Sequence, residues 1–439
     1  MATFFQTLFT RSGVHAAAKN FGWMVVDKAV RLSCSILVGF WVARYLGPER
    51  FGLLSYLIAC VGIGSAFVEL GLDGIVRREV LRSPDDAGKV LAAARCLRLG
   101  AGAVAALVLV GGAWASGGGS DETRLALILA MLFFQPGLSV ADLWLHARLQ
   151  ARAVTLAQMP AVLVGAGVRI GLILTEAPLV AFAVAMVVEA VVAVTMLNLL
   201  ARRSGLPPLR PVLRGRCVAL ARDGWPLLIS SLAVMVYLRI DTLMLRHYLG
   251  EEAVGVFVAA TRISESSYFV PVILASSVLP ALLRARDQGQ EAYAARLQQY
   301  YDASAALAYI FAAMLILAAP WLIPLAYGPA YAGATTVLMV HAFSQFGALL
   351  GVARGQFLVN EGYTRFYLLA TLAGAAVNVL LNLWLIPRHG PVGAAWATVA
   401  AQVVSVWGSS FAWKKTRVTG WMQARALLVP VLGWRYLAR

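Results

Sequence analysis

The stretch PLVAFAVAMVVEAVVAVTMLNLLA at residues 178–201 carries one ionisable side chain, Glu189, in 24 residues. A helix needs about 20 apolar residues to cross the hydrocarbon core of a membrane, where its backbone must hydrogen bond to itself. Outward from this stretch, comparable ones lie at 21–45, 51–71, 90–115, 125–146, 154–175, 224–248, 254–283, 302–326, 334–359, 366–386 and 392–413. The sequence therefore predicts an all-α polytopic membrane protein with about 12 transmembrane helices.

The composition agrees with a membrane-spanning chain. Hydrophobic residues make up 60% of the 439 residues, charged residues only 13%, and the mean hydropathy is +0.76. A soluble domain carries about twice that share of charge. The formal net charge of +16 is spread over the gaps between spans and forms no single basic patch, so we expect no nucleic-acid partner.

The distribution of Lys and Arg predicts the orientation. With a cytoplasmic N-terminus, about 25 of the 37 lie on the cytoplasmic side, about 5 face outward and about 7 lie inside spans. Cytoplasmic segments of membrane proteins carry the excess of positive charge, so we expect both termini inside. The clusters are Arg77, Arg78, Arg82 and Lys89, then Arg202, Arg203, Arg210, Arg214, Arg216 and Arg222, then Lys414, Lys415 and Arg417. Binding to anionic membrane lipids accounts for them.

Two copies of a short motif indicate an internal repeat. Residues 45–52 read YLGPERFG and residues 248–255 read YLGEEAVG, an offset of about 203 residues. Six spans separate the copies, so the halves are predicted to be parallel repeats, two six-helix bundles around a central cavity. The expected organisation is an interfacial N-terminal segment (1–20), an N-terminal bundle (21–201), a cytoplasmic basic linker (202–223), a C-terminal bundle (224–413) and a basic cytoplasmic or interfacial tail (414–439).

Charged residues inside the spans need a partner, a water-filled cavity or a function, because burying them in lipid costs several kcal/mol. Arg239 and Arg262 lie at similar depth in neighbouring antiparallel spans and form a candidate phosphate site. The guanidinium group binds phosphate oxygens through two parallel hydrogen bonds. The alternative is that Asp241 and Glu265 balance the two arginines in internal ion pairs.

The first span adds Arg31 to the candidate site, with Lys28 near its cytoplasmic entrance. Arg169 and Glu189 lie at compatible depths in adjacent spans and are expected to pair. Arg95, Arg98 and Asp142 lie near cytoplasmic ends, where they could line the inner mouth of the cleft. Four carboxylates are candidates for coupling transport to protons or sodium, or for counter-ions to arginine: Asp27, Asp241, Glu265 and Glu189.

Signs of enzyme chemistry are weak. The chain lacks a Gly-Lys-Ser/Thr phosphate-binding loop, and its five histidines are scattered. Four cysteines are too few for a disulfide framework. We therefore expect no enzyme activity, no cofactor and no bound metal centre.

Several motifs together resemble the polysaccharide-transport flippases of the multidrug/oligosaccharidyl-lipid/polysaccharide exporter superfamily. They are the turn at Leu46 to Gly52, its copy running into Ala259 to Glu265, Pro271 with Leu279-Pro280, the sequence AYGPAY at 326–331, Asn378 to Asn382, Leu385 to Pro387, and Gly390 to Ala395. The resemblance implies an alternating-access transporter of the bacterial inner membrane. Its implied substrate is undecaprenyl-diphosphate-linked oligosaccharide, such as an O-antigen unit, moved to the outer leaflet, with polysaccharide-assembly proteins as possible partners.

Three other functions stay open at this point. A multidrug antiporter of the same superfamily shares the helix plan, but its cleft should favour carboxylates, whereas this one is richer in arginine. A flippase for the peptidoglycan lipid precursor needs the same cationic cleft. A glycan polymerase or ligase is expected to have a sizeable outer loop, and the longest outer gap here, 116–124, has only about nine residues.

Overall fold

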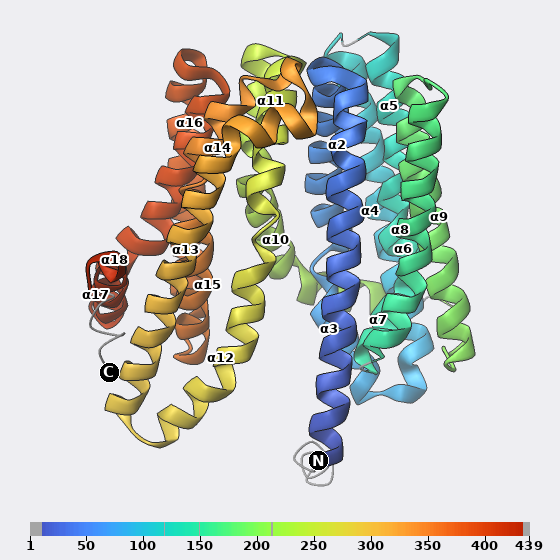
Figure 1. The fold of residues 1–439 in the computed structure, drawn as a ribbon. Coiled ribbons are helices and arrows are strands. Elements are labelled where there is room, and N and C mark those ends of the chain that lie inside the picture. Colours follow the sequence, from blue (N-terminus) through green and yellow to red (C-terminus); the bar gives the residue numbers. More distant parts are fainter. Residues whose placement is uncertain (1–10, 118, 149, 212–213, 433–439) are drawn as a thin grey trace. The chain divides into compact units, whose positions relative to one another are not determined.

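The structure, a computed structural model, describes the backbone of residues 11–117, 119–148, 150–211 and 214–432. Side chains are described at 36–117, 119–148, 150, 153–211 and 214–430. Every regular element in these ranges is helical (Figure 1). The predicted fold class, an all-α polytopic membrane protein, is confirmed.

The twelve predicted spans fall on ten helical segments of the described residues. Two segments, Ile36–Arg82 with 47 residues and Thr364–Phe411 with 48, are about twice the length that one crossing needs. Each overlaps two predicted spans and consists of two helices, because the backbone leaves helical geometry between them at Gly47 (φ 74°) or Gly390 (φ 57°). A positive φ favours glycine, and the proline that follows each one lacks the N–H that would continue the helix.

The described residues form two compact units. Unit 1 contains the described residues up to Tyr45 together with Leu57–Met235, and unit 2 contains Leu46–Tyr56 together with the described residues from Val236 onward. The helices within or entering unit 1 are α2 (Arg11–Glu69), α3 (Leu72–Arg82), η1 (Pro84–Asp86), α4 (Ala87–Ala115), α5 (Ser120–Ala130), η2 (Met131–Phe134), α6 (Gln135–Leu138), α7 (Val140–Ala147), α8 (Ala151–Leu174), α9 (Leu179–Arg203) and the start of α10 (Arg214–Leu249).

Unit 2 takes the rest of α10 and the helices that follow. These are α11 (Glu251–Glu265), α12 (Phe269–Asp287), α13 (Gln290–Tyr327), η3 (Pro329–Tyr331), α14 (Ala334–His341), α15 (Ser344–Asn360), α16 (Thr364–Gln402), the π-helical turn η4 (Val403–Trp407), η5 (Gly408–Phe411), η6 (Lys414–Thr416), α17 (Arg417–Ala426) and α18 (Val429–Leu432). The predicted linker at 202–223 is partly helical, because α9 extends to Arg203 and α10 begins at Arg214.

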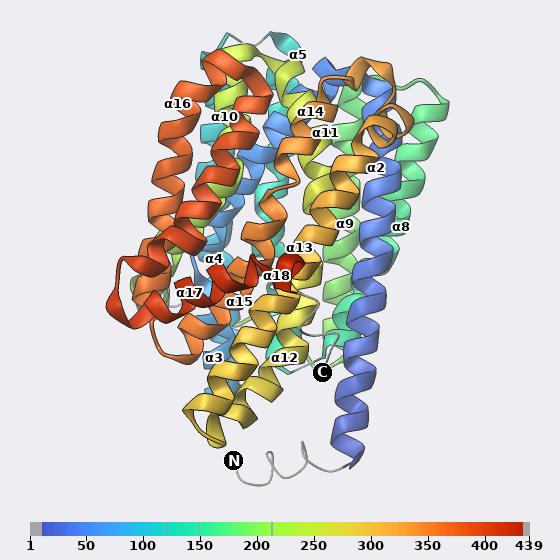
Figure 2. The same cartoon turned by 60° about the vertical axis from the view of Figure 1, so that its left-hand side comes forward.

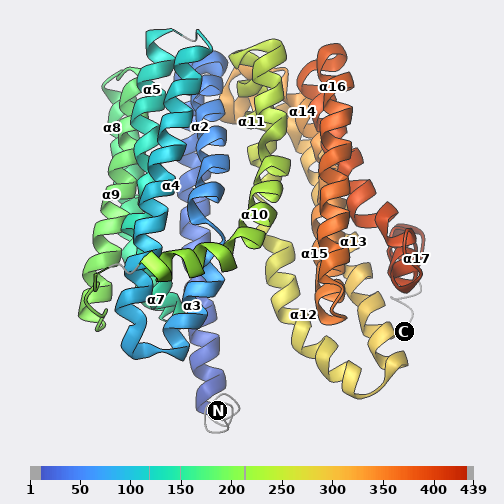
Figure 3. The same cartoon turned by 180° about the vertical axis from the view of Figure 1, so that it is seen from behind.

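In unit 1, α8 and α9 run side by side as an antiparallel pair (Figure 1). The core at the other side of the unit is built on α3, α4 and α7, with Leu72, Leu91 and Trp144 almost fully buried. The first turns of α10 run across beside α3 and α7 (Figure 3). Gly71 and Gly224 let the backbones meet there, because a Cβ on either would press into the backbone of the other segment.

In unit 2, the two copies of the repeated motif touch each other through glycine. A Cβ on Gly52 would overlap the carbonyl oxygen of Glu251, and a Cβ on Gly255 would overlap the carbonyl oxygen of Pro48. Pro48 and Glu251 occupy equivalent positions in the two copies, and so do Gly52 and Gly255, with an offset of about 203 residues in both cases. The two contacts are therefore reciprocal, and neither glycine has room for a side chain.

The C-terminal helix α17 lies across unit 2, at a steep angle to α13 and α15 (Figure 2). Its buried face is small or polar, with Thr419, Gly420 and Gln423. Trp421 is 68% exposed and Val418 56%. Apolar and basic residues on the outer face are typical of a helix in the membrane interface, and this position of the tail stays a prediction. Of the predicted N-terminal segment, residues 1–10 lie outside the described residues and 11–20 continue into α2.

Candidate functional site

The most deeply buried carboxylate among the candidates, Asp241 of α10, lies in unit 2 against α16. Asn382 Nδ2 donates a hydrogen bond to its Oδ1, and Thr398 Oγ1 donates to its Oδ2 at 2.7 Å. Asp241 is 6% exposed and Asn382 0%. The break at Gly390 lets α16 supply one partner from each of its two arms, so the carboxylate is held between them.

Further oxygen and amide groups adjoin this carboxylate. Asn378 lies one turn before Asn382, and its Oδ1 accepts a hydrogen bond from Asn382 Nδ2 at 3.1 Å. The Oδ1 of Asn382 is buried and has no described hydrogen-bond partner. The cluster therefore joins one carboxylate to neutral oxygen atoms, the ligand type that hard cations prefer. No group of three or more His, Cys, Asp or Glu side chains that could hold a metal occurs among the described residues.

The charged candidates nearest to Asp241 are Arg239 and Glu265. Arg239 and Asp241 both act electrostatically on the carboxylate of Glu265, and the side chains of Arg239 and Glu265 are exposed in this chain. Arg262 is half-buried and has Tyr327 as an electrostatic neighbour. The structure thus gives the two arginines different surroundings, and Asp241 is bound by amide and hydroxyl donors.

The candidates of the first span lie outside the described side chains. Asp27, Lys28 and Arg31 belong to the helical backbone of α2, but the description of side chains begins at Ile36. Their proposed contact with a diphosphate therefore stays a prediction.

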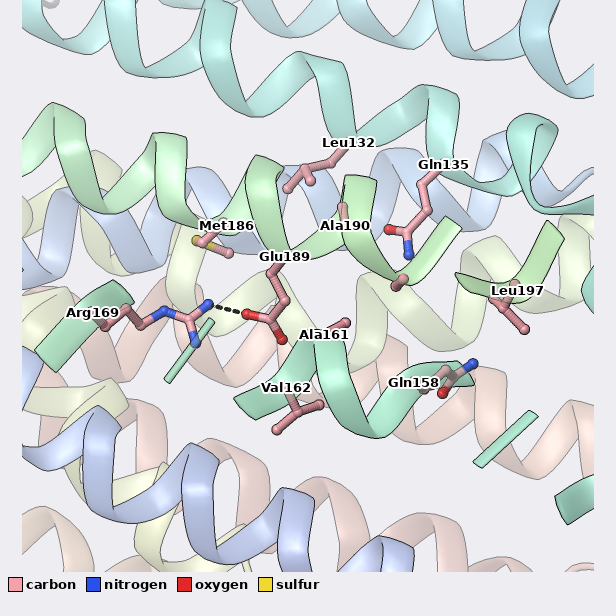
Figure 4. A pocket seen from close by; sticks show the side chains of 11 residues that line it. Leu132, Gln135, Gln158, Ala161, Val162, Arg169, Met186, Glu189, Ala190 and Leu197 are labelled. Atoms are coloured by element: carbon pink, nitrogen blue, oxygen red, sulfur yellow. Dashed lines mark hydrogen bonds and ion pairs between the residues drawn. The ribbon is translucent and has the colours of Figure 1, made fainter. Parts of the chain in front are cut away.

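In unit 1 the predicted pair of Arg169 and Glu189 is present. Arg169 Nη2 donates to Glu189 Oε2 at 2.5 Å, joining α8 to α9 (Figure 4). Gly165 makes room for the carboxylate, because a Cβ there would overlap Glu189 Oε2. The side chains of Arg169 and Glu189 are 23% and 27% exposed, and both line a cavity of about 320 Å³.

Arg98 and Asp142, the two candidates for the mouth of a cleft with described contacts, both bind neighbours within unit 1. Arg98 is 3% exposed, forms an ion pair with Asp73 and donates to the carbonyl oxygen of Pro136 at 3.3 Å. It is therefore enclosed within unit 1, whereas the sequence suggested a place at the mouth of a cleft. Asp142 lies 3.4 Å from His146, its neighbour on α7.

Sequence reasoning missed Arg354 of α15, which is 2% exposed. Its guanidinium donates to Ser410 Oγ at 2.9 Å, to the carbonyl oxygen of Ser405 at 3.0 Å and to Ser409 Oγ at 2.8 Å. These bonds hold the end of the α16 segment, where π and 3₁₀ turns leave carbonyl groups without helical partners. The available signal was an arginine inside the predicted span at 334–359, five residues before its end.

Comparisons with known sequences agree on a transporter superfamily. A family model described as polysaccharide biosynthesis protein matches residues 17–286, and a second model, MatE, matches residues 226–384. The uncharacterized membrane protein YabM of Bacillus subtilis (strain 168) is 37% identical over 100 residues. That match spans 23% of this chain and 18% of YabM.

Solved structures show the same fold at low sequence identity. The lipid II flippase MurJ in an inward closed conformation has a TM-score of 0.71 at 13% identity, covering 96% of this chain and 93% of MurJ. An inward-facing multidrug resistance MATE transporter of the MOP superfamily has a TM-score of 0.67 at 17% identity, covering 89% and 94%. A MOP superfamily transporter from Pyrococcus furiosus Vc1 (DSM3638), whose binding pocket is described as having reverse polarity, has a TM-score of 0.59 at 16% identity, covering 94% and 96%.

Proposed function

Because this chain belongs to the polysaccharide biosynthesis protein family, we propose that it translocates undecaprenyl-diphosphate-linked oligosaccharide across the bacterial inner membrane. At the coarser level it is a multi-pass membrane transporter with the fold of the multidrug/oligosaccharidyl-lipid/polysaccharide exporter superfamily. The glycan moves from the cytoplasmic to the outer leaflet by alternating access, and both termini are cytoplasmic. The movement breaks no covalent bond, so the proposal requires no enzyme chemistry.

The position of Arg239 carries the proposal. It lies ten residues before the end of α10 at Leu249, which corresponds to about 15 Å along the helix and half the thickness of the hydrocarbon core. Its side chain is exposed in the chain, so a fixed positive charge is available at mid-membrane. A lipid-linked diphosphate supplies the matching anion. Arg262, Arg31 and Lys28 are proposed as further contacts along its path.

Asp241 is proposed as the residue that couples transport to an ion. Its carboxylate is bound by Asn382 and Thr398, which are neutral, and it can therefore accept a proton or a sodium ion without breaking an ion pair. The oxygen of Asn382 that has no described partner would complete the coordination. Glu265, Glu189 and Asp27 remain candidates for counter-ions to arginine.

The test is the leaflet distribution of glycan-lipid in cells that lack the protein and are complemented with variants. Wild type and Arg124→Ala, a control at an exposed outer turn whose ion pair with Asp121 is 3.6 Å long, should restore the outward pool. Arg239→Ala should leave glycan-lipid on the cytoplasmic side and lower the rate by about tenfold or more, because the proposed contact between its guanidinium and the diphosphate is lost. Normal transport by Arg239→Ala would contradict the role of this arginine.

A second function, flipping of the peptidoglycan lipid precursor, is favoured by the similarity of fold to MurJ. The two substrates share the diphosphate and differ in the headgroup, so both lipids should be offered to the same proteoliposomes. Preferential flipping of the peptidoglycan precursor would show that this lipid, and not the lipid-linked oligosaccharide, is the substrate. If neither lipid moves but a cationic dye is exported, the multidrug function replaces both.

A further inference from the structure

The cavity beside the Arg169–Glu189 pair lies wholly in unit 1 and has a volume of about 320 Å³. We call it the α8–α9 slot. Gln158, Ala161 and Arg169 line it from α8, Glu189 and Ala193 line it from α9, and Gln135 closes it from the start of α6 (Figure 4). The volume is near the lower end of the range for small-molecule sites, about 300–1,000 Å³.

The slot is elongated and polar at both ends. Gln158 and Arg169 are eleven residues apart on α8, which corresponds to about 16 Å along the helix. The close-up shows the amides of Gln135 and Gln158 toward one end and the ion pair toward the other (Figure 4). Ionisable groups at membrane depth face a protein interior or water rather than lipid. The polar lining of the slot is therefore expected to face protein or water rather than lipid.

The charges in the slot cancel. Arg169 and Glu189 contribute one positive and one negative charge, and the remaining polar groups among the described lining residues are carboxamides. A diphosphate would need unbalanced cations, and a lipid tail would leave the amides without partners. A neutral ligand rich in hydroxyl groups satisfies the slot best, because each hydroxyl both donates and accepts hydrogen bonds.

Small residues keep the slot open. Gly165 allows the carboxylate of Glu189 to lie against α8, and Ala161, Ala190 and Ala193 leave space between the two helices. The three alanines carry methyl groups, and a larger side chain at any of them would fill the cavity, whereas even a methyl group at Gly165 would overlap Glu189. The arrangement therefore suits a ring with apolar faces and polar edges.

We propose that the α8–α9 slot binds a sugar of the transported glycan, with Gln135 and Gln158 hydrogen bonding to hydroxyl groups at one end and the Arg169–Glu189 pair at the other. This rests on the proposed function and deepens it. The arginines of the other spans recognise the diphosphate, and the slot recognises the carbohydrate. Discrimination between glycans is then set in unit 1.

The test measures saccharide binding and lipid binding separately on the purified full-length protein in detergent. The saccharide probe is the free oligosaccharide released from the glycan-lipid by mild acid, followed by saturation-transfer NMR. The lipid probe is undecaprenyl diphosphate without sugar. Ala193→Phe fills the slot, and the matched control Val191→Phe places the same side chain on a 56% exposed face of the same helix.

The expected result is that wild type and Val191→Phe bind the oligosaccharide equally, while Ala193→Phe binds it about tenfold more weakly or not at all. Binding of undecaprenyl diphosphate should be the same in all three proteins. Gln135→Leu/Gln158→Leu, which removes hydrogen-bonding groups with little change in volume, should repeat the loss and guards against misfolding of Ala193→Phe.

Each other outcome has a distinct meaning. Oligosaccharide binding at the wild-type level in both slot variants overturns the slot as the sugar site. Absence of saccharide binding to wild type, with normal transport of glycan-lipid, overturns the slot and leaves the proposed function intact. Absence of glycan-lipid transport by wild type overturns the proposed function itself, and the sugar site with it.

Discussion

The two units satisfy several of their charges in different ways, although unit 2 also holds an ion pair between Arg246 and Glu251. In unit 1, Arg169 meets Glu189 and Arg98 meets Asp73, so each charge lies against its opposite. In unit 2, the carboxylate of Asp241 and the guanidinium of Arg354 are bound by amide, hydroxyl and carbonyl groups. The ion pairs of unit 1 leave no net charge. In unit 2, the charges of Asp241 and Arg354 are stabilised by the dipoles of neutral groups.

The difference has a functional consequence. An ion pair must break before either member can take a different counter-ion, and breaking it leaves an unpaired charge in a low-dielectric environment. A charge bound by neutral dipoles can exchange a mobile counter-ion while its protein contacts remain. We therefore expect ion coupling in unit 2 and neutral ligand recognition in unit 1.

The largest expected effect comes from Asp241→Asn. The substitution preserves the shape of the side chain and removes its charge, so transport driven by a proton or sodium gradient should be abolished while the protein remains folded. Proteoliposomes with imposed gradients measure this, with the exposed outer-turn variant Asp121→Asn as the control. Gradient-dependent transport by Asp241→Asn at the wild-type rate would show that another carboxylate couples transport to the ion.

Arg354→Ala is expected to be the most destabilising of these substitutions. It removes three hydrogen bonds from a guanidinium that is 2% exposed, and should lower the free energy of unfolding by about 2–4 kcal/mol. The control Arg388→Ala removes an exposed side chain bonded to the carbonyl of Trp384, and should change stability by about 0.5 kcal/mol or less. Unfolding in detergent followed by tryptophan fluorescence compares the two variants. Equal stability of both would show that the dipoles around Arg354 contribute little.

The smallest expected effect distinguishes the pair in unit 1. Glu189→Ala alone leaves Arg169 unpaired and should cost about 1–3 kcal/mol of stability. The double variant Arg169→Ala/Glu189→Ala should be more stable than Glu189→Ala, because the unpaired charge is gone. Thermal unfolding of the single and double variants gives the coupling energy. Additive losses would mean that the two side chains act independently, which the 2.5 Å contact argues against.

The fold was predictable because its signal is local. The apolar stretches are long enough to identify each span, and the repeated motif at Tyr45 and Tyr248 relates the halves. What the apolar stretches could not reveal is how short two of the connections are, since the non-helical backbone at Gly47 or Gly390 is enough to separate two successive helices. A glycine before a proline indicates a break, but it does not say how few residues the turn needs.

The site was predictable only where opposite charges meet. Arg169 and Glu189 lie in consecutive spans, and their depth and charge predict the pair. The partners of Asp241 are 141 and 157 residues away and are uncharged, so neither spacing nor charge points to them. Arg354 was missed for the same reason, because its serine partners carry no charge signal.

The reciprocal glycine contact of the repeated motif bears on ancestry. A surface that meets its own copy, with each glycine against the other copy's carbonyl, is the pattern of a two-fold homodimer interface. In a dimer, any substitution there would appear on both sides at once. When both copies lie in one chain, the residues on the two sides can differ. Position 48 is Pro and the equivalent position 251 is Glu, while both glycines are present. A contact between two repeats of one chain thus combines a part that is the same on both sides, the glycines, with a part that differs, Pro48 and Glu251.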